Sequence, residues 1–196
     1  MKSTKHTRMI AGCGMLTAVA VVLQYIEIAI PLMPSFVKLD FSDLPELIGA
    51  FAYGPLAGAA IAVVKNLMHL VVSQSAVIGE LSNALLGIAF AVFAGLVYKI
   101  KKTRKTALLA GSCAAAVMAL VSWPLNYFII YPLYYSVMGF PEVAILGMYQ
   151  ALLPAVSSIA QALLIFNVPF TLVKGLLCVA IAMVIYKPLS HVLKKK

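Results

Sequence analysis

Residues 38–70 read KLDFSDLPELIGAFAYGPLAGAAIAVVKNLMHL, and this stretch predicts two helices joined by a tight reversal. The first helix is expected to begin with Asp43 as its N-cap and Glu46 as the return half of a capping box. The Gly-Pro pair that follows reverses the chain into an apolar run over 56–72. The first helix is only about eleven residues long, so it cannot cross a membrane core of about 30 Å alone.

The composition is typical of an integral membrane protein. Of the 196 residues, 63% are hydrophobic and 11% charged, whereas charged residues make up about 25% of a soluble domain. The hydrophobic helices are expected over 9–30, 43–53, 56–72, 79–98, 107–131 and 168–186. A mixed, partly helical segment is expected between the last two, because prolines and glycines interrupt it.

The sequence therefore predicts an all-α membrane protein, a bundle of six transmembrane helices, in one domain covering 1–196. No internal repeat or linker divides it. The first apolar stretch, 9–30, exceeds the roughly 7–15 apolar residues of a secretion signal and is expected to remain as a span.

Charge predicts the orientation of these helices. Twelve of the fifteen basic residues fall in three clusters, at residues 2–8, 99–105 and 187–196. Basic residues are retained on the cytoplasmic side of a membrane, so both termini are expected to be cytoplasmic. The connections 31–42 and 73–78 and the mixed segment 132–165 then lie outside. All six acidic residues fall in intervals that this assignment places outside or near the outer surface.

Several classes of chemistry are excluded by pattern. The sequence has no Walker A, HExxH or GxSxG motif, so any ATP that powers it must be hydrolysed by another chain. Cys13, Cys113 and Cys178 sit in apolar runs without metal-ligand spacing, and no metal site or disulfide is expected. The basic residues flank membrane spans, which argues against nucleic acid as a partner.

Polar residues on the apolar helices are the candidates for a binding site, since burying them in a membrane is costly. In the last span, Asn167, Thr171 and Lys174 are spaced i, i+4 and i+7 and share one face. This face lies close to the expected outer end of the span.

The fourth and fifth spans carry polar residues at a similar depth. Glu80, Asn83 and Gly87 share a face of the fourth span, and Asn126 lies beside Tyr127 near the outer end of the fifth. Their convergence with the last span predicts a ligand cavity that opens outward.

Each of these residues also has a purely structural interpretation. Asparagine and threonine often satisfy neighbouring backbone in membrane bundles, and Lys65 or Lys174 could pair with a carboxylate. Asn66 and His69 are expected, with Lys65, to be packing or ion-pair groups.

A strip of small residues, Ala11, Gly14 and Ala18, follows the first span. Small side chains let helices approach closely. The strip is expected either to pack inside the bundle or to dock another subunit, and the pattern does not distinguish the two.

Four segments closely resemble the riboflavin-specific S components of energy-coupling factor (ECF) transporters. They are the opening stretch, SNALLG at 82–87, PLNYFIIYPLYY at 124–135 and VPFTLVKG at 168–175. The resemblance covers nearly the whole chain. It implies a six-helix capture subunit in the bacterial plasma membrane, with a transmembrane coupling subunit and two ATP-binding subunits as partners.

The resemblance also implies roles for individual residues. Lys38, Leu39 and Asp40 match the loop that covers the flavin, whereas Asn126 and Lys174 match polar residues of the site. The family commonly has asparagine where this chain has Thr171. Asn167, one turn earlier on the same face, is the candidate to replace it.

The expected function is capture of riboflavin outside and its delivery inward, driven by ATP hydrolysis in the partner subunits. The pyrimidine-dione edge of the flavin ring alternates donors and acceptors, which suits amides and a lysine in an apolar cavity. No cofactor and no enzymatic reaction are expected. The alternatives are an S component for another vitamin, an intramembrane enzyme, for which no catalytic pairing is visible, and a structural membrane protein without ligand.

Overall fold

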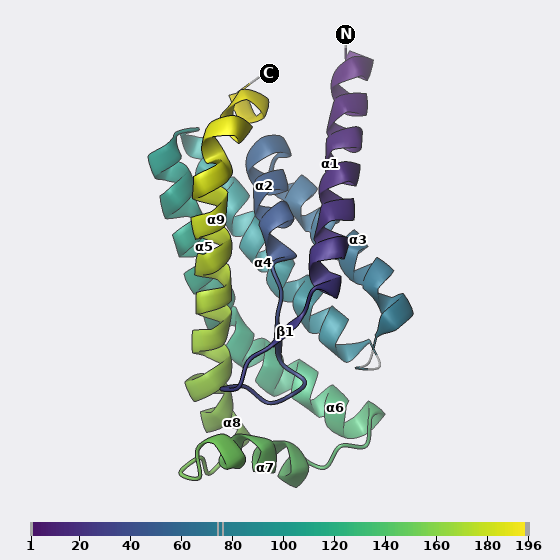
Figure 1. Cartoon of the computed structure of the whole chain (residues 1–196), viewed down its shortest axis with the longest axis vertical. Helices are drawn as coiled ribbons and strands as arrows, with labels where there is room; N and C mark the ends of the chain where they lie inside the picture. The colour runs from purple at the N-terminus through teal and green to yellow at the C-terminus, as the bar shows by residue number, and fades with distance from the viewer. Residues whose placement is uncertain (1, 74, 76, 195–196) are drawn as a thin grey trace.

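The computed structural model describes residues 2–73, 75 and 77–194. Long helices form a bundle, and shorter helices lie across one end of it (Figure 1). The elements in chain order are α1 (Lys2–Tyr25), β1 (Ile28–Ala29), β2 (Lys38–Leu39), α2 (Asp43–Tyr53), α3 (Pro55–His69), η1 (Leu70–Val72), α4 (Ile78–Ile100), α5 (Arg104–Leu125), η2 (Asn126–Ile130), α6 (Tyr131–Val137), α7 (Glu142–Leu152), α8 (Ile159–Ala162), η3 (Leu163–Asn167) and α9 (Val168–Lys194).

Five helical stretches within the described residues are long and apolar enough to cross a membrane. They are His6–Tyr25, Pro55–Val72, Ile78–Ile100, Arg104–Val137 and Ile159–Ile185. The remaining bundle helix, α2, has 11 residues, most of them buried. It packs against α1, α3, α4 and α9. Among the described residues, five helices of spanning length and one short helix therefore make up the bundle, where six transmembrane helices are expected from the sequence.

Two prolines widen long helices where the sequence predicts a helix boundary. Pro132 and Pro169 each follow a five-residue π-helical turn, η2 and η3. A proline ring clashes with the carbonyl four residues earlier, here that of Phe128 or Ile165, and it lacks an amide donor. A wider turn relieves both problems while the helix continues. The fifth helix thus extends to Val137 rather than ending near residue 131.

The last long helix begins at Ile159, well before the expected start at residue 168. Ser158 is its N-cap, and the Ser158 hydroxyl accepts a hydrogen bond from the backbone amide of Gln161. This local capping signal lies inside the segment that the sequence predicts to be mixed.

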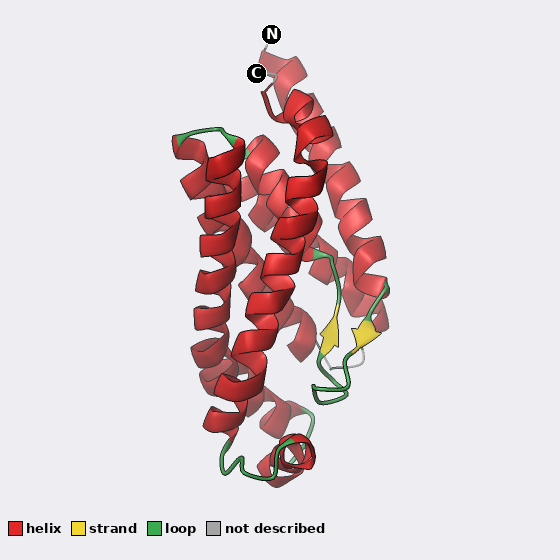
Figure 2. Cartoon of the chain, turned by 60° about the vertical axis from the view of Figure 1, so that its left-hand side comes forward, coloured by secondary structure: helices red, strands yellow, loops and turns green. Residues whose placement is uncertain are grey.

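A short hairpin replaces the loop expected after the first span. The first helix ends at Tyr25 rather than near residue 30, because β1 pairs with β2 in an antiparallel register of Ile28 with Leu39. We call β1, β2 and the connecting residues 30–37 the hairpin. It lies alongside the bundle, as Figure 2 shows in yellow and green.

The capping box predicted at Asp43 and Glu46 is wrong. Ser42 occupies the N-cap position of α2, and it makes no side-chain capping bond. Both carboxylates instead pair with Lys65 of α3. Residues three apart share a helix face, so the spacing that suggests a capping box also directs both carboxylates towards one partner.

The segments that carry the three basic clusters lie at one end of the bundle. Both chain termini are at this end in Figure 1, and the turn between α4 and α5 is beside them in Figure 2. The hairpin and α6 to α8 lie towards the other end.

Two buried clusters form the core. One includes Leu47 and Phe90 and joins α2, α4, α5 and α9. The other includes Ile145 and Tyr149 and joins α6, α7 and α8 to the π turns.

Gly58 allows α2, α3 and α4 to meet closely. A Cβ atom there would lie 2.8 Å from the Glu46 carbonyl oxygen and from the Cβ atoms of Ala50 and Ala91. We predict that Gly58→Ala destabilises the protein by about 1–3 kcal/mol, as overpacking does. The measurement is thermal unfolding in detergent by circular dichroism. Gly147→Ala in α7 is the control, since nothing lies within 4 Å of a Cβ there, and equal unfolding temperatures would contradict the prediction.

Candidate functional site

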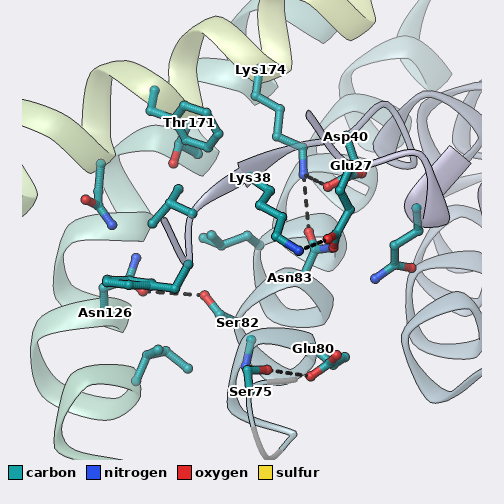
Figure 3. Close-up of a pocket in the computed structure, with 18 of the residues that line it drawn as sticks. Glu27, Lys38, Asp40, Ser75, Glu80, Ser82, Asn83, Asn126, Thr171 and Lys174 are labelled. Carbon is teal, nitrogen blue, oxygen red and sulfur yellow. Dashed lines mark hydrogen bonds and ion pairs between the residues drawn. The ribbon is translucent and has the colours of Figure 1, made fainter. Parts of the chain in front are cut away.

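A cavity of about 600 Å³ lies between the hairpin and the bundle. Its lining comes from the end of α1, the hairpin, the end of α3, α4, the η2–α6 region and the η3–α9 region. The volume is within the range of about 300–1,000 Å³ that is usual for small-molecule sites. Figure 3 shows that polar side chains from these separate segments point into one space.

Most of the site residues predicted from the sequence line this cavity. They are Lys38, Asp40, Glu80, Asn83, Asn126, Asn167, Thr171 and Lys174. Two of the predicted residues are not in the lining. Leu39 pairs with Ile28 in the hairpin, and the ring of Tyr127 stacks on Trp123 with 5.4 Å between centroids.

A buried charge cluster, which we define as Asp40, Asp43, Glu46, Lys65 and Lys174, adjoins the cavity, and Asp40 and Lys174 are its members in the cavity lining. Lys65 Nζ lies 2.8 Å from Asp43 Oδ1 and 2.6 Å from Glu46 Oε1. Lys174 Nζ lies 2.9 Å from Asp40 Oδ2 and 3.1 Å from Asp43 Oδ2. Asp43 therefore bridges the two lysines and connects α3 to α9 through the start of α2.

The charge cluster also holds the end of the hairpin. Asp40 Oδ1 accepts hydrogen bonds from the Ser42 backbone amide, at 2.8 Å, and from the Ser42 hydroxyl. Ser42 in turn accepts from Lys65 Nζ. The pairing expected of Lys65 and Lys174 with carboxylates is thus present, and Lys174 lines the cavity as well, 3.4 Å from Asn83 Oδ1.

A second polar group lies at the hairpin side of the cavity. Glu80 Oε1 is 3.0 Å from His69 Nδ1, and Glu80 Oε2 accepts from the hydroxyls of Ser73 and Ser75. Glu27 pairs with Lys38 across the hairpin. The sequence predicts Glu80 and Lys38 as site residues but not Glu27, because Glu27 falls within the expected first span, 9–30, whereas α1 ends at Tyr25.

Aromatic side chains form part of the wall and were also missed. Phe36 of the hairpin contacts Tyr131 and Tyr134, with centroids 6.4 and 5.9 Å apart. All three line the cavity together with Phe170. The high density of aromatic residues in PLNYFIIYPLYY is the sequence signal that could have indicated this wall. Such walls suit a flat, partly apolar ligand.

The Asn126 side chain keeps unused hydrogen-bonding groups that a ligand can bind. Its Nδ2 donates to the Ser122 carbonyl at 2.7 Å, and its Oδ1 accepts a long bond of 3.4 Å from Ser82. An amide has two donors and two acceptor sites. One N–H and one lone pair of Asn126 therefore remain for a bound molecule.

The side chains that line the cavity are suited to recognising a ligand. In the part of the chain that the structure describes, no three His, Cys, Asp or Glu side chains come together in a way that could hold a metal ion. Carboxylates, lysines, amides and aromatic rings instead surround one cavity. This arrangement can recognise a ligand that combines a flat ring with several hydrogen-bonding groups.

The small-residue strip lies away from this cavity. Ala11, Gly14 and Ala18 are exposed on α1, and a Cβ at Gly14 would have nothing within 4 Å. Gly12, on another face of α1, is the glycine that packs against Tyr53. The strip therefore does not pack inside the bundle, which was one of its two expected roles.

Comparison with known proteins identifies related sequences and structures. A family model described as "ECF transporter, substrate-specific component" matches residues 8–186. The riboflavin transporter RibU of Staphylococcus aureus is 32% identical over 182 residues, covering 93% of this chain and 90% of that protein. The riboflavin transporter FmnP of Bacillus subtilis is 26% identical, covering 88% and 87%. A solved S component of a bacterial ECF transporter superposes with a TM-score of 0.75 and 31% identity, covering 97% of this chain and 99% of that one.

The charge cluster predicts a large difference between two lysine substitutions. Lys65→Met leaves the buried Glu46 without its cation and Asp43 with Lys174 alone, and breaking a buried pair costs about 3–5 kcal/mol. Lys38→Met removes a partly exposed pair with Glu27, worth about 0–1 kcal/mol. Thermal unfolding of the two variants without ligand measures the difference. Similar losses of stability would show that the buried cluster is not a major support of the fold.

Proposed function

Because the chain belongs to the substrate-specific (S) components of ECF transporters, we propose that its cavity captures riboflavin and that the chain passes the vitamin across a cell membrane. The S component itself binds and moves, and it catalyses no reaction. ATP is hydrolysed by two ATP-binding subunits, which act through a transmembrane coupling subunit. Riboflavin is the transported ligand rather than a cofactor.

One observation carries the choice of ligand: amides and a lysine from α4, η2 and α9 converge on one cavity with aromatic walls. The isoalloxazine ring is flat and largely apolar, while its pyrimidine-dione edge alternates carbonyl acceptors with an N–H donor. Asn126, Asn167 and Lys174 supply the complementary groups. Glu80 and the serine hydroxyls near it are suited to the hydroxyls of the ribityl chain.

The distribution of charge supports outward-facing capture. The three basic segments lie at one end of the bundle, and the hairpin beside the cavity lies towards the other. Basic segments remain on the cytoplasmic side. The cavity then faces the exterior, with the hairpin next to its entrance and both termini in the cytoplasm.

Asn126 provides the direct test of the ligand assignment. We predict that Asn126→Ala weakens riboflavin binding by about 1–3 kcal/mol, because a polar group of the buried ligand loses its partner. Quenching of flavin fluorescence on titration with purified protein gives the affinity. Tyr127→Phe is the matched control, since its ring stacks on Trp123 rather than lining the cavity. Unchanged affinity in a folded Asn126→Ala protein would remove this residue from the site.

We further propose that Ala11, Gly14 and Ala18 form the surface that docks the coupling subunit. Exposed small residues in a row allow another helix to approach α1 closely. Polar residues that line the cavity are absent from this part of α1 among the described side chains. Docking and ligand binding are therefore assigned to different surfaces of the molecule.

Gly14→Leu tests the docking surface. The added side chain projects into open space, so the variant is expected to fold and to bind riboflavin with unchanged affinity. It should lose ATP-dependent uptake and co-purification with the partner subunits, because the bulkier residue obstructs helix approach. Full uptake and assembly in this variant would exclude the strip as the docking surface. Gly147→Leu in α7, at another open glycine, controls for the added bulk.

A further inference from the structure

Three buried side chains from separate elements form a closed ring of hydrogen bonds next to the cavity. The hydroxyls of Tyr131 and Tyr149 are 2.5 Å apart. Tyr149 donates to Asn167 Oδ1 at 2.7 Å, and Asn167 Nδ2 donates to the Tyr131 hydroxyl at 3.5 Å. The ring joins α6, α7 and the π turn η3.

The donors and acceptors of the ring balance. Since the Tyr149 hydroxyl gives its hydrogen to Asn167, Tyr131 must donate to Tyr149, and the Tyr131 oxygen accepts from the amide nitrogen. Burial raises the pKa of the Tyr149 phenol to about 12, so this hydroxyl keeps its hydrogen at any physiological pH. The Asn167 amide is thus fixed with its oxygen turned to Tyr149 and one N–H unused.

Asn167 and Tyr149 differ in their relation to the ligand site. Asn167 lines the cavity, at the last position of η3. Tyr149 is completely buried, 0% exposed, and it is not in the cavity lining. Any effect of the Tyr149 hydroxyl on a ligand must therefore pass through Asn167 or Tyr131.

We propose that Tyr149 is a positioning residue that holds the Asn167 amide with its N–H towards the cavity, so that Asn167 recognises a hydrogen-bond acceptor such as a ring carbonyl of the ligand. This rests on the proposed riboflavin site and deepens it. Helix α7, which lies across the end of the bundle, thereby contributes to ligand recognition without touching the ligand.

Core packing by itself would predict a different behaviour. The Tyr149 ring contacts Phe166 with centroids 5.4 Å apart, and it belongs to the buried cluster around α7. Tyr149→Phe retains that ring and removes only the hydroxyl. If the Tyr149 hydroxyl contributes only to stability, its loss should change the affinity for riboflavin either not at all or equally with and without the Asn167 side chain.

A double-mutant cycle on riboflavin affinity separates these two roles. Tyr149→Phe is expected to raise the Kd about tenfold, which corresponds to roughly 1.4 kcal/mol, and Asn167→Ala at least as much. In the Asn167→Ala background, Tyr149→Phe should change the Kd less than about twofold, which is less than about a third of that energy. Tyr135→Phe in α6 is the control, because Tyr135 is only partly buried and is not in the cavity lining.

Each outcome bears on the proposal. Equal effects of Tyr149→Phe in the two backgrounds, or no effect in the wild-type background, would overturn the positioning role. Normal binding by Asn167→Ala would overturn it as well. If Asn126→Ala still weakened binding in that case, the proposed riboflavin site would stand without the positioning role. Circular dichroism at the titration temperature establishes that every variant compared is folded. Failure of the unaltered protein to bind riboflavin would reject the proposed function instead.

Discussion

The structure depends on keeping two lysines and three carboxylates together inside an apolar bundle. A lone charge in such surroundings costs several kcal/mol, so α3 and α9 cannot move away from the start of α2 without leaving Lys65 or Lys174 unpaired. This constraint explains why a helix too short to cross a membrane occupies the middle of the bundle: it carries Asp43 and Glu46. Through Asp40, the same cluster fixes the hairpin beside the ligand cavity.

Two residues of the site lie in π turns, where the α-helical pattern is interrupted. Asn126 is the first residue of one π turn and Asn167 the last residue of the other. Proline two positions after each turn removes an amide donor and widens the helix, and such turns are frequent at functional sites. The cost of the irregular backbone is offset locally, because the side chains at these positions bond to neighbouring groups such as the Ser122 carbonyl and the Tyr149 hydroxyl.

Much of the fold could be predicted from the sequence because apolar runs and prolines are local signals. The cavity residues on η3 and α9 could be predicted as well, since the spacing of Asn167, Thr171 and Lys174 alone places them on one face. The capping box failed because a local pattern does not register Lys65, which lies 22 residues beyond Asp43. The hairpin gave no signal, as each strand has two residues. Proline by itself predicts a helix end, whereas the helix here continues through a π turn at Pro132 and Pro169.

The two lysines of the charge cluster differ in when their partners become available during synthesis. Lys65 follows Asp43 by 22 residues, so its pair can form as soon as α2 and α3 have entered the membrane. Lys174 follows Asp40 by 134 residues, so Asp40 has no lysine partner on α9 until most of this sequence has been synthesised. Insertion of α9 is therefore the step that neutralises Asp40 and fastens the hairpin in place. The ligand cavity is completed last, when the final helix leaves the ribosome.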